Sequence, residues 1–155
     1  MLSLPHTFLL AKDGYRELIG AQDYVKLGIK FVSGGIAARR SYASKNRDVT
    51  VRLIKATLEG IKTMGAQEAL AKKTFARYSR QSDPQVLDQI YKFALATVEK
   101  DPAIPRDAIQ SMARLMGDLG FVDRSSVSST PVDAFYDNSY VDEIKQSGFL
   151  KELWR

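Results

Sequence analysis

The sequence contains no cysteine and a single histidine, His6. The absence of cysteine excludes disulfides, thiolate nucleophiles and cysteine-bound metals, and it leaves the cellular compartment open. One histidine without acidic residues at ligand spacing does not indicate a metal site. A nucleophilic triad also lacks support, because no Gly-x-Ser-x-Gly motif is present. We therefore expect no enzyme activity, no catalytic residue, no metal and no cofactor.

Long apolar runs are also missing. No segment approaches the roughly 18–20 apolar residues that span a bilayer. The N-terminal sequence MLSLPHTFLLAKDG has no basic region before its apolar residues, and Pro5 and His6 interrupt these residues. We therefore do not expect a signal peptide.

What is present is typical of one globular domain. The chain has 155 residues, of which 45% are hydrophobic and 26% are charged. The net charge of +5 is uneven, since residues 1–80 carry 15 Lys and Arg against 6 Asp and Glu, and residues 81–155 carry 8 against 12. The basic residues are spread along predicted helices with acidic neighbours, which favours solvated helix faces over nucleic-acid binding.

The clearest element is a helix predicted over residues 46–64. Apolar residues recur there with helical spacing, and Asn46 is expected to cap the helix. Asp48 places a negative charge in the first turn, where the helix dipole favours it, and Gly65 is expected to follow the last turn. The apolar stripe consists of Val51, Ile54, Leu58 and Ile61.

Further helices are expected in the rest of the chain. One is a short N-terminal helix that ends before Gly14. The others are predicted over residues 66–78, from Pro84 to Lys100, over residues 106–119 and over residues 141–146. Residues 125–130 are expected to form a polar loop.

Residues 28–38 contain the one strand-like segment. Its alternating side chains predict a strand, and Gly34 with Gly35 then interrupts it. This glycine pair indicates a turn, a hinge or a close approach of the backbone to a ligand. The sequence therefore predicts a mainly α chain with a short β segment.

Three segments together resemble one protein family. They are LSLPHTFLLAKDGYREL (residues 2–18), IAARRSYASKNRDVTVRLIKATLEGI (residues 36–61) and PVDAFYDNSYVDEIKQSGFLKELW (residues 131–154). In this order they resemble the C-terminal half of the ABC-transporter substrate-binding proteins for nitrate, sulfonate, taurine and thiamine-pyrimidine-like solutes. The resemblance covers nearly all of the chain.

The resemblance implies the C-terminal part of an α/β type II periplasmic-binding-protein fold. It assigns residues 1–27 to the end of the second lobe, residues 28–38 to the returning hinge strand and residues 39–155 to the helical part of the first lobe. The implied function is the solute-binding component of an ABC importer, outside the cytoplasm, for a small anionic or heteroaromatic solute. The implied partners are this solute and the membrane permease.

The resemblance also implies a ligand site. It places Ser3, Pro5, His6 and Thr7 on a loop facing the solute cleft, and Gly34 and Gly35 near the hinge. Leu4-Pro5 stands where the family has two prolines, so the shape of this loop departs from the family pattern. The related pyrimidine-synthase branch of the superfamily uses a cofactor and a cysteine-rich motif, which this sequence lacks.

Family members are considerably longer than this chain, which leads to two expectations. Apolar faces that would cover an absent sheet are expected to be exposed and to favour self-association. With half of the cleft missing, tight solute binding by the chain alone is not expected. The alternative function is a stand-alone helical interaction protein that binds no solute.

Overall fold

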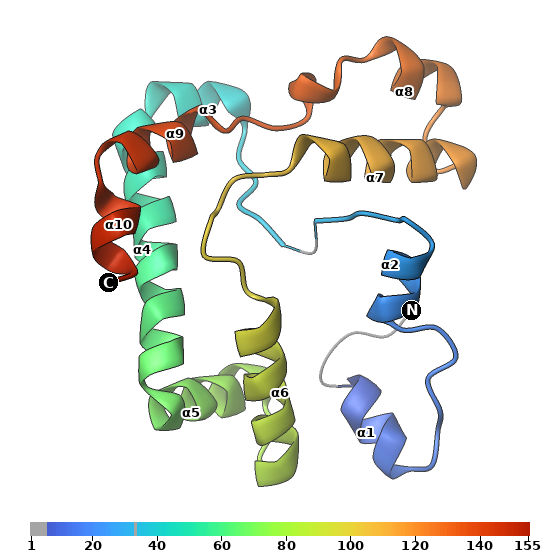
Figure 1. The fold of residues 1–155 in the computed structure, drawn as a ribbon, viewed down its shortest axis with the longest axis vertical. Helices are drawn as coiled ribbons and strands as arrows, with labels where there is room; N and C mark the ends of the chain where they lie inside the picture. Colours follow the sequence, from blue (N-terminus) through green and yellow to red (C-terminus); the bar gives the residue numbers. More distant parts are fainter. Residues whose placement is uncertain (1–5, 33) are drawn as a thin grey trace. The chain divides into compact units, whose positions relative to one another are not determined.

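The computed structural model describes residues 6–32 and 34–155, and these residues form helices joined by turns and extended segments (Figure 1). The helices are α1 (His6–Lys12), α2 (Ala21–Lys26), α3 (Arg40–Lys45), α4 (Arg47–Ala66), α5 (Glu68–Ser79), α6 (Pro84–Thr97), α7 (Arg106–Asp118), α8 (Arg124–Ser129), the 3-10 helix η1 (Val132–Ala134), α9 (Ser139–Gln146) and α10 (Phe149–Leu153).

The predicted α/β fold class is wrong. No strand occurs in residues 6–32 or 34–155. The segment predicted as a strand has no neighbouring strand there, and its backbone amides bond elsewhere. The Lys30 amide donates to Ser111 Oγ at 3.2 Å, and the Val32 amide donates to Met112 Sδ at 3.2 Å. Because α7 supplies these acceptors, the segment remains extended without forming a sheet.

The described residues divide into two compact units. The first contains residues 6–18, 56–100 and 153–155, and the second contains residues 19–32, 34–55 and 101–152. Each unit therefore joins segments that are distant in the sequence, and α4 contributes to both. The assignment of residues 1–27, 28–38 and 39–155 to lobes stays a prediction.

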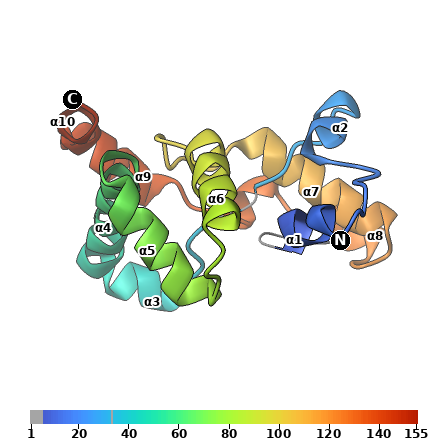
Figure 2. The same ribbon diagram turned by 90° about the horizontal axis from the view of Figure 1, so that it is seen from below.

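The first unit is built around α5 and α6, which lie side by side in both views (Figures 1 and 2). Lys72 of α5 forms ion pairs with Glu68 on its own helix and with Asp88 on α6. The buried residues Ala71, Val86 and Tyr91 lie on these two helices. The helix pair therefore combines a small apolar contact with a charged rim.

Asp83 determines where α6 begins. Its carboxylate accepts hydrogen bonds from the amides of Gln85 at 2.8 Å and Val86 at 3.3 Å, and Pro84 follows in the first turn. Asp83 also forms an ion pair with Lys12 of α1. The bond from Lys12, together with the two amides, lowers the pKa of Asp83. The helix start predicted at Pro84 is confirmed, and Asp83 caps the helix.

The second unit has a small apolar core. Ala43 of α3, Val51 of α4, and Tyr140 and Ile144 of α9 are buried together, and Ile54, Phe149 and Leu150 pack against them. The Arg47 side chain of α4 contacts two residues of α9 at the edge of this core. Its guanidinium lies 4.5 Å from the centre of the Tyr140 ring, and its Nε donates to Glu143 at 2.7 Å. The core therefore links the start of α4 to the C-terminal helices.

The helix predicted over residues 46–64 is confirmed as α4, with different ends. Val51 and Leu58 are buried and Ile54 and Ile61 are half-buried, as the apolar stripe predicts. Asn46 directly precedes α4, as predicted, and its carbonyl accepts from the Thr50 amide at 3.0 Å. Its side chain does not cap the helix, because its amide group donates to the Tyr42 carbonyl at 2.9 Å. The predicted C-terminal end is wrong, since Gly65 lies inside the helix, which continues to Ala66.

Candidate functional site

A cavity of about 390 Å³ lies in the second unit, between α7 and the extended segment that begins at Gly28. Most of its lining side chains are polar or charged, and all are exposed or half-buried, so the cavity opens to solvent. It is lined by Gly28, Ile29, Lys30, Asp107, Gln110, Ser111, Arg114, Leu115 and Asp118.

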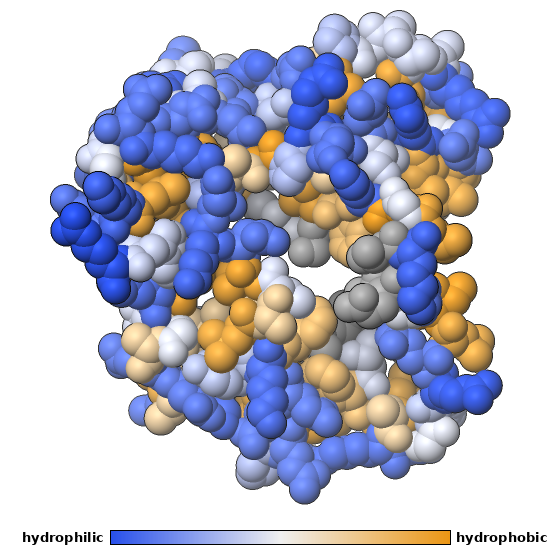
Figure 3. Space-filling view, in the orientation of Figure 1, coloured by the Kyte–Doolittle hydropathy of each residue, from blue (hydrophilic) through white to orange (hydrophobic). Residues whose placement is uncertain are grey.

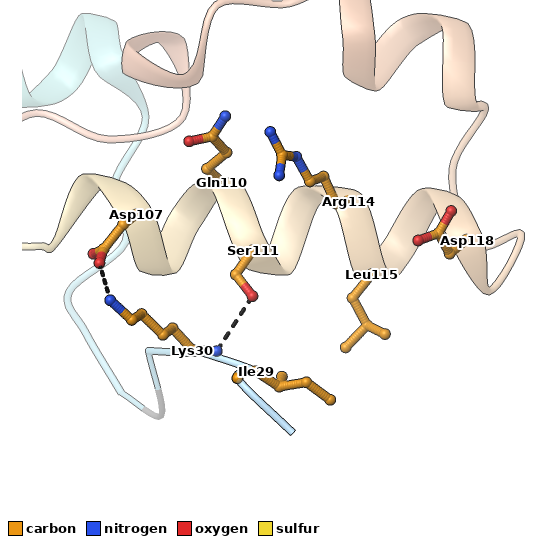
Figure 4. Close-up of a pocket in the computed structure, with 9 residues that line it drawn as sticks. Ile29, Lys30, Asp107, Gln110, Ser111, Arg114, Leu115 and Asp118 are labelled. Atoms are coloured by element: carbon orange, nitrogen blue, oxygen red, sulfur yellow. Dashed lines mark hydrogen bonds and ion pairs between the residues drawn. The ribbon is translucent and has the colours of Figure 1, made fainter. Parts of the chain in front are cut away.

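The extended segment is held against α7 by two polar contacts. The Lys30 ammonium forms an ion pair with Asp107 at 2.5 Å, and the Lys30 amide donates to Ser111 Oγ. Because Asp107 and Ser111 are four residues apart, they lie one turn from each other on the same face of the helix. Figure 4 shows both contacts, with Leu115 pointing from α7 toward the same segment.

Both carboxylates of the cavity have cationic partners. Asp107 pairs with Lys30, and Asp118 pairs with Arg124 of α8 at 3.0 Å. The hydrogen bond from Lys30 lowers the pKa of Asp107, so this carboxyl group is ionised at neutral pH. Neither carboxylate is therefore left to attract a further cation.

Gln110 and Arg114 are the polar groups of the cavity that are still available. Their side chains make no hydrogen bond or ion pair with any other residue in the described ranges. They are four residues apart, and Figure 4 shows both side chains on the side of α7 opposite to Ser111, Leu115 and residues 29–30. Together they present a guanidinium and a carboxamide to solvent.

The residues predicted to bind ligand belong to two different units. His6 and Thr7 begin α1 in the first unit, with His6 exposed and Thr7 half-buried. Ser3 and Pro5 lie outside the described residues. Gly34 and Gly35 lie in the second unit. None of the described members of this set lines the α7 cavity.

The glycine pair shows no close approach to the rest of the chain. Both residues are exposed, and a Cβ added to either would meet no atom of the described structure within 4 Å. In this structure, sterics therefore do not explain why glycine stands at these two positions. The prediction that they contact a ligand remains untested.

Sequence reasoning did not identify the cavity residues. The helix over residues 106–119 is predicted from the spacing of its apolar residues. This spacing does not indicate whether the polar side chains of the helix line a cavity. The spacing of Gln110 and Arg114 could have indicated a polar pair on one helix face. The position of the cavity beside residues 28–30 depends on contacts across the sequence, which a single sequence does not reveal.

An apolar turn at the end of α7 is the second candidate surface. Gly120 adopts a positive φ of 74°, and the Phe121 amide donates to the Met116 carbonyl at 2.9 Å, a Schellman geometry that ends the helix. Four apolar side chains of this turn remain exposed, and Figure 3 shows apolar surface at this end of α7. The apolar turn consists of Met116, Leu119, Phe121 and Val122.

The adjoining helix α8 packs closely on α7. Gly117 is buried, and a Cβ at this position would lie 3.4 Å from Arg124 Cγ and 3.5 Å from Val127 Cγ2. A methyl group here would therefore lie in van der Waals contact with α8. The Arg124 guanidinium of α8 lies beside Asp118, at the edge of the cavity.

Within the described residues, no group of three or more His, Asp or Glu side chains is arranged to bind a metal ion. In the same residues, no helix is long and apolar enough to cross a membrane. Comparisons with known protein families, with curated proteins and with solved structures find no match.

Proposed function

We propose that the chain contributes solute binding to an ABC importer, as part of the component that captures a small anionic or heteroaromatic solute. Three segments, spread over nearly the whole sequence, support the proposal through their resemblance to such proteins. The proposal concerns binding and does not include the α/β fold. Its partners are the solute and the membrane permease of the importer.

The α7 cavity is the observation that carries this proposal. Its volume of about 390 Å³ lies within the range of roughly 300–1,000 Å³ that is typical of small-molecule sites. Ile29 and Leu115 supply apolar surface, while Lys30, Asp107 and Ser111 supply polar groups on the same side of α7. The cavity can therefore contact both the apolar and the polar parts of a small solute.

Binding by the chain alone is expected to be weak. The cavity is open, so a solute keeps much of its contact with water and little affinity comes from enclosure. We expect dissociation constants in the millimolar range, about 4 kcal/mol of binding free energy. Amide chemical shifts in NMR titrations measure such affinities, with nitrate, taurine, benzenesulfonate and aminopyrimidine as probes.

At least one probe is expected to give a saturating shift of resonances from the second unit. Glycerol at equal concentration is the control, because it is small and polar but carries no charge or aromatic ring. If all four probes give only the small, linear shifts that glycerol gives, the proposal of solute binding is wrong.

The apolar turn favours a second candidate function, a helical protein that associates with a second copy of itself. Four apolar side chains are exposed within seven consecutive residues of one short segment, and apolar side chains that gather on a surface can mark an interaction site. Under this proposal the turn of one copy packs against that of the other. Burial of paired Leu119 and Phe121 side chains would provide the stabilising contact.

Light scattering after size exclusion tests this candidate. The wild-type chain is expected to elute as a dimer whose population rises with concentration, and Phe121→Asp is expected to elute as a monomer. Tyr15→Asp is the matched control, since Tyr15 is a similarly exposed aromatic residue of the first unit, at 67% against 70%. A monomeric wild type at all concentrations contradicts self-association.

A further inference from the structure

We propose that the C-terminal part of α5, with the residue that follows it, binds single-stranded nucleic acid through three cations and one aromatic ring. The four residues, Lys73, Arg77, Tyr78 and Arg80, form the basic tract; all are exposed and all belong to the first unit. The proposal goes beyond solute binding and does not depend on it, because no residue of the basic tract lines the α7 cavity.

The charge of the basic tract is not neutralised by its surroundings. From residue 69 to residue 82 the sequence holds four cations and no acidic residue. Glu68 on the same helix and Asp88 on α6 pair with Lys72, which is not part of the tract. The three cations of the tract form no ion pair within residues 6–32 and 34–155. They are therefore available to a polyanion, whose counterions they displace on binding.

The spacing of the cations suits a chain of phosphates better than a single anion. Lys73 and Arg77 are four residues apart and lie one turn from each other on the same face of α5. Arg80 comes directly after the last turn of the helix. The positive charges are thus spread along the end of the helix, as a backbone of successive phosphates requires.

Tyr78 supplies a surface on which a base can stack. Its ring is 79% exposed, and the Arg77 guanidinium lies 5.7 Å from the ring centre. Every base has an aromatic face, so an exposed ring can bind a single strand with little sequence preference, and a neighbouring arginine adds a cation–π contribution. In a duplex the bases are already stacked on one another. The exposed ring therefore favours a single strand over a duplex.

An anionic membrane fits the same surface less well. Helices that lie on membranes insert an apolar face rich in Trp, Phe and Leu beneath their basic residues. Residues 73–80 contain no Leu, Ile or Trp, and their one phenylalanine, Phe75, is half-buried in the fold. The tract can attract a charged surface, but it has few apolar side chains to insert there.

A second basic stretch, residues 39–47, provides the matched comparison. It also holds four cations and an exposed tyrosine, Tyr42, at 55%. Two of these cations already have partners, because Arg40 donates to the Ala134 carbonyl at 2.9 Å and Arg47 Nε donates to Glu143 at 2.7 Å. The Glu143 carboxylate also repels a phosphate. We therefore expect nucleic acid to bind the basic tract and not this stretch.

Fluorescence anisotropy with a labelled oligothymidylate of about 12 nucleotides tests the proposal, at a salt concentration of about 50 mM. The wild-type chain is expected to bind, and Tyr78→Ala is expected to weaken binding roughly tenfold because a stacked base is lost. Tyr42→Ala is the matched control, since it removes an exposed tyrosine beside other cations. Its affinity is expected to stay within about twofold of the wild type.

The salt dependence of binding tests the three cations. Neutralisation of three phosphates predicts a slope of about −2 when the logarithm of the association constant is plotted against that of the salt concentration. Arg77→Gln is expected to change this slope to about −1.4, because one phosphate contact is lost. Arg39→Gln removes the same charge from the second basic stretch and is expected to leave the slope unchanged.

Three results would overturn the proposal. One is a wild-type chain that does not bind the oligonucleotide at low salt. Another is an equal loss of affinity in the two tyrosine variants, or an equal change of slope in the two arginine variants, since binding would then follow net charge alone. The third is binding to phosphatidylglycerol vesicles with a larger loss for Tyr78→Ala than the oligonucleotide shows. None of these results bears on solute binding in the second unit.

Discussion

Replacement of Ile144 by alanine is expected to lower the free energy of unfolding of the second unit by about 2–5 kcal/mol. Ile144 is fully buried, with 0% of its surface exposed, and it lies among Ala43, Val51 and Tyr140. The substitution removes three carbon atoms from the centre of this group. Two effects add up: the transfer free energy of the deleted atoms, and the weaker dispersion attraction among the side chains that surround the resulting cavity.

The small size of this core makes the effect large relative to total stability. A domain is typically stable by only about 5–15 kcal/mol, so a loss of this size removes a substantial part of its stability. Urea unfolding followed by circular dichroism measures the change. Amide hydrogen exchange within α9 shows whether the second unit is the part that opens.

Ile36→Ala is the matched control for this experiment. It makes the same chemical change in the same unit, but the Ile36 side chain is 46% exposed. Its deletion is expected to cost less than about 1 kcal/mol. Equal losses for the two variants would show that Ile144 is not a core residue and that α9 does not pack on α4 as described.

The helices of the core could be predicted because their signals are local. The stripe from Val51 to Ile61 repeats with helical period, and one face of α4 is accordingly buried. Gly120 and Gly148 both adopt positive φ just after helices, as their positions in the sequence predict. Such elements depend on residues within one or two turns, which a sequence displays directly.

The predicted strand failed because a strand depends on a partner elsewhere in the chain. Alternation of side chains over residues 28–33 is a valid local signal, but no second strand is available in the described structure to complete a ladder. Ser111 and Met112 of α7 accept the amide hydrogens instead. Nothing near residue 30 in the sequence indicates a partner eighty residues later, as for the cavity itself.

Helix α8 was also missed, for a different reason. Its sequence SSVSST is rich in serine, which favours turns because the hydroxyl competes for backbone groups. Asp123 reverses this preference by accepting hydrogen bonds from the amide of Ser126 at 3.0 Å and from its hydroxyl at 3.1 Å. Packing against Gly117 of α7 then supports the helix. The cap was visible in the sequence, but its packing surface was not.

Asn138→Asp is expected to destabilise the second unit by about 1–3 kcal/mol at neutral pH. The Asn138 side chain bonds both backbone groups of Ile104: its Nδ2 donates to the carbonyl at 3.0 Å, and its Oδ1 accepts from the amide at 2.9 Å. This pair attaches the segment between α6 and α7 to the start of α9. A carboxylate can still accept from the amide but cannot donate to the carbonyl.

Two effects of the new charge oppose each other. A carboxylate at the residue before α9 gains about 0.3–1 kcal/mol from the helix dipole. The carboxylate cannot donate a hydrogen bond to the half-buried Ile104 carbonyl, so two oxygens face each other with no proton between them. This loss is larger than the gain from the helix dipole. The net change is therefore destabilising while the introduced group is ionised, and the loss becomes smaller when the group is protonated.

A pH series distinguishes this explanation from a simple loss of packing. When protonated, the introduced carboxyl group again donates to the Ile104 carbonyl, so folding raises its pKa above the ordinary value of about 4. The stability of the variant relative to the wild type is therefore greatest at acidic pH and is lost as pH rises through the raised pKa. Asn138→Ala lacks both hydrogen bonds and is expected to show a deficit that does not vary with pH. If the deficit of Asn138→Asp is equally constant from pH about 3 to 7, the hydrogen bond to Ile104 does not stabilise the unit.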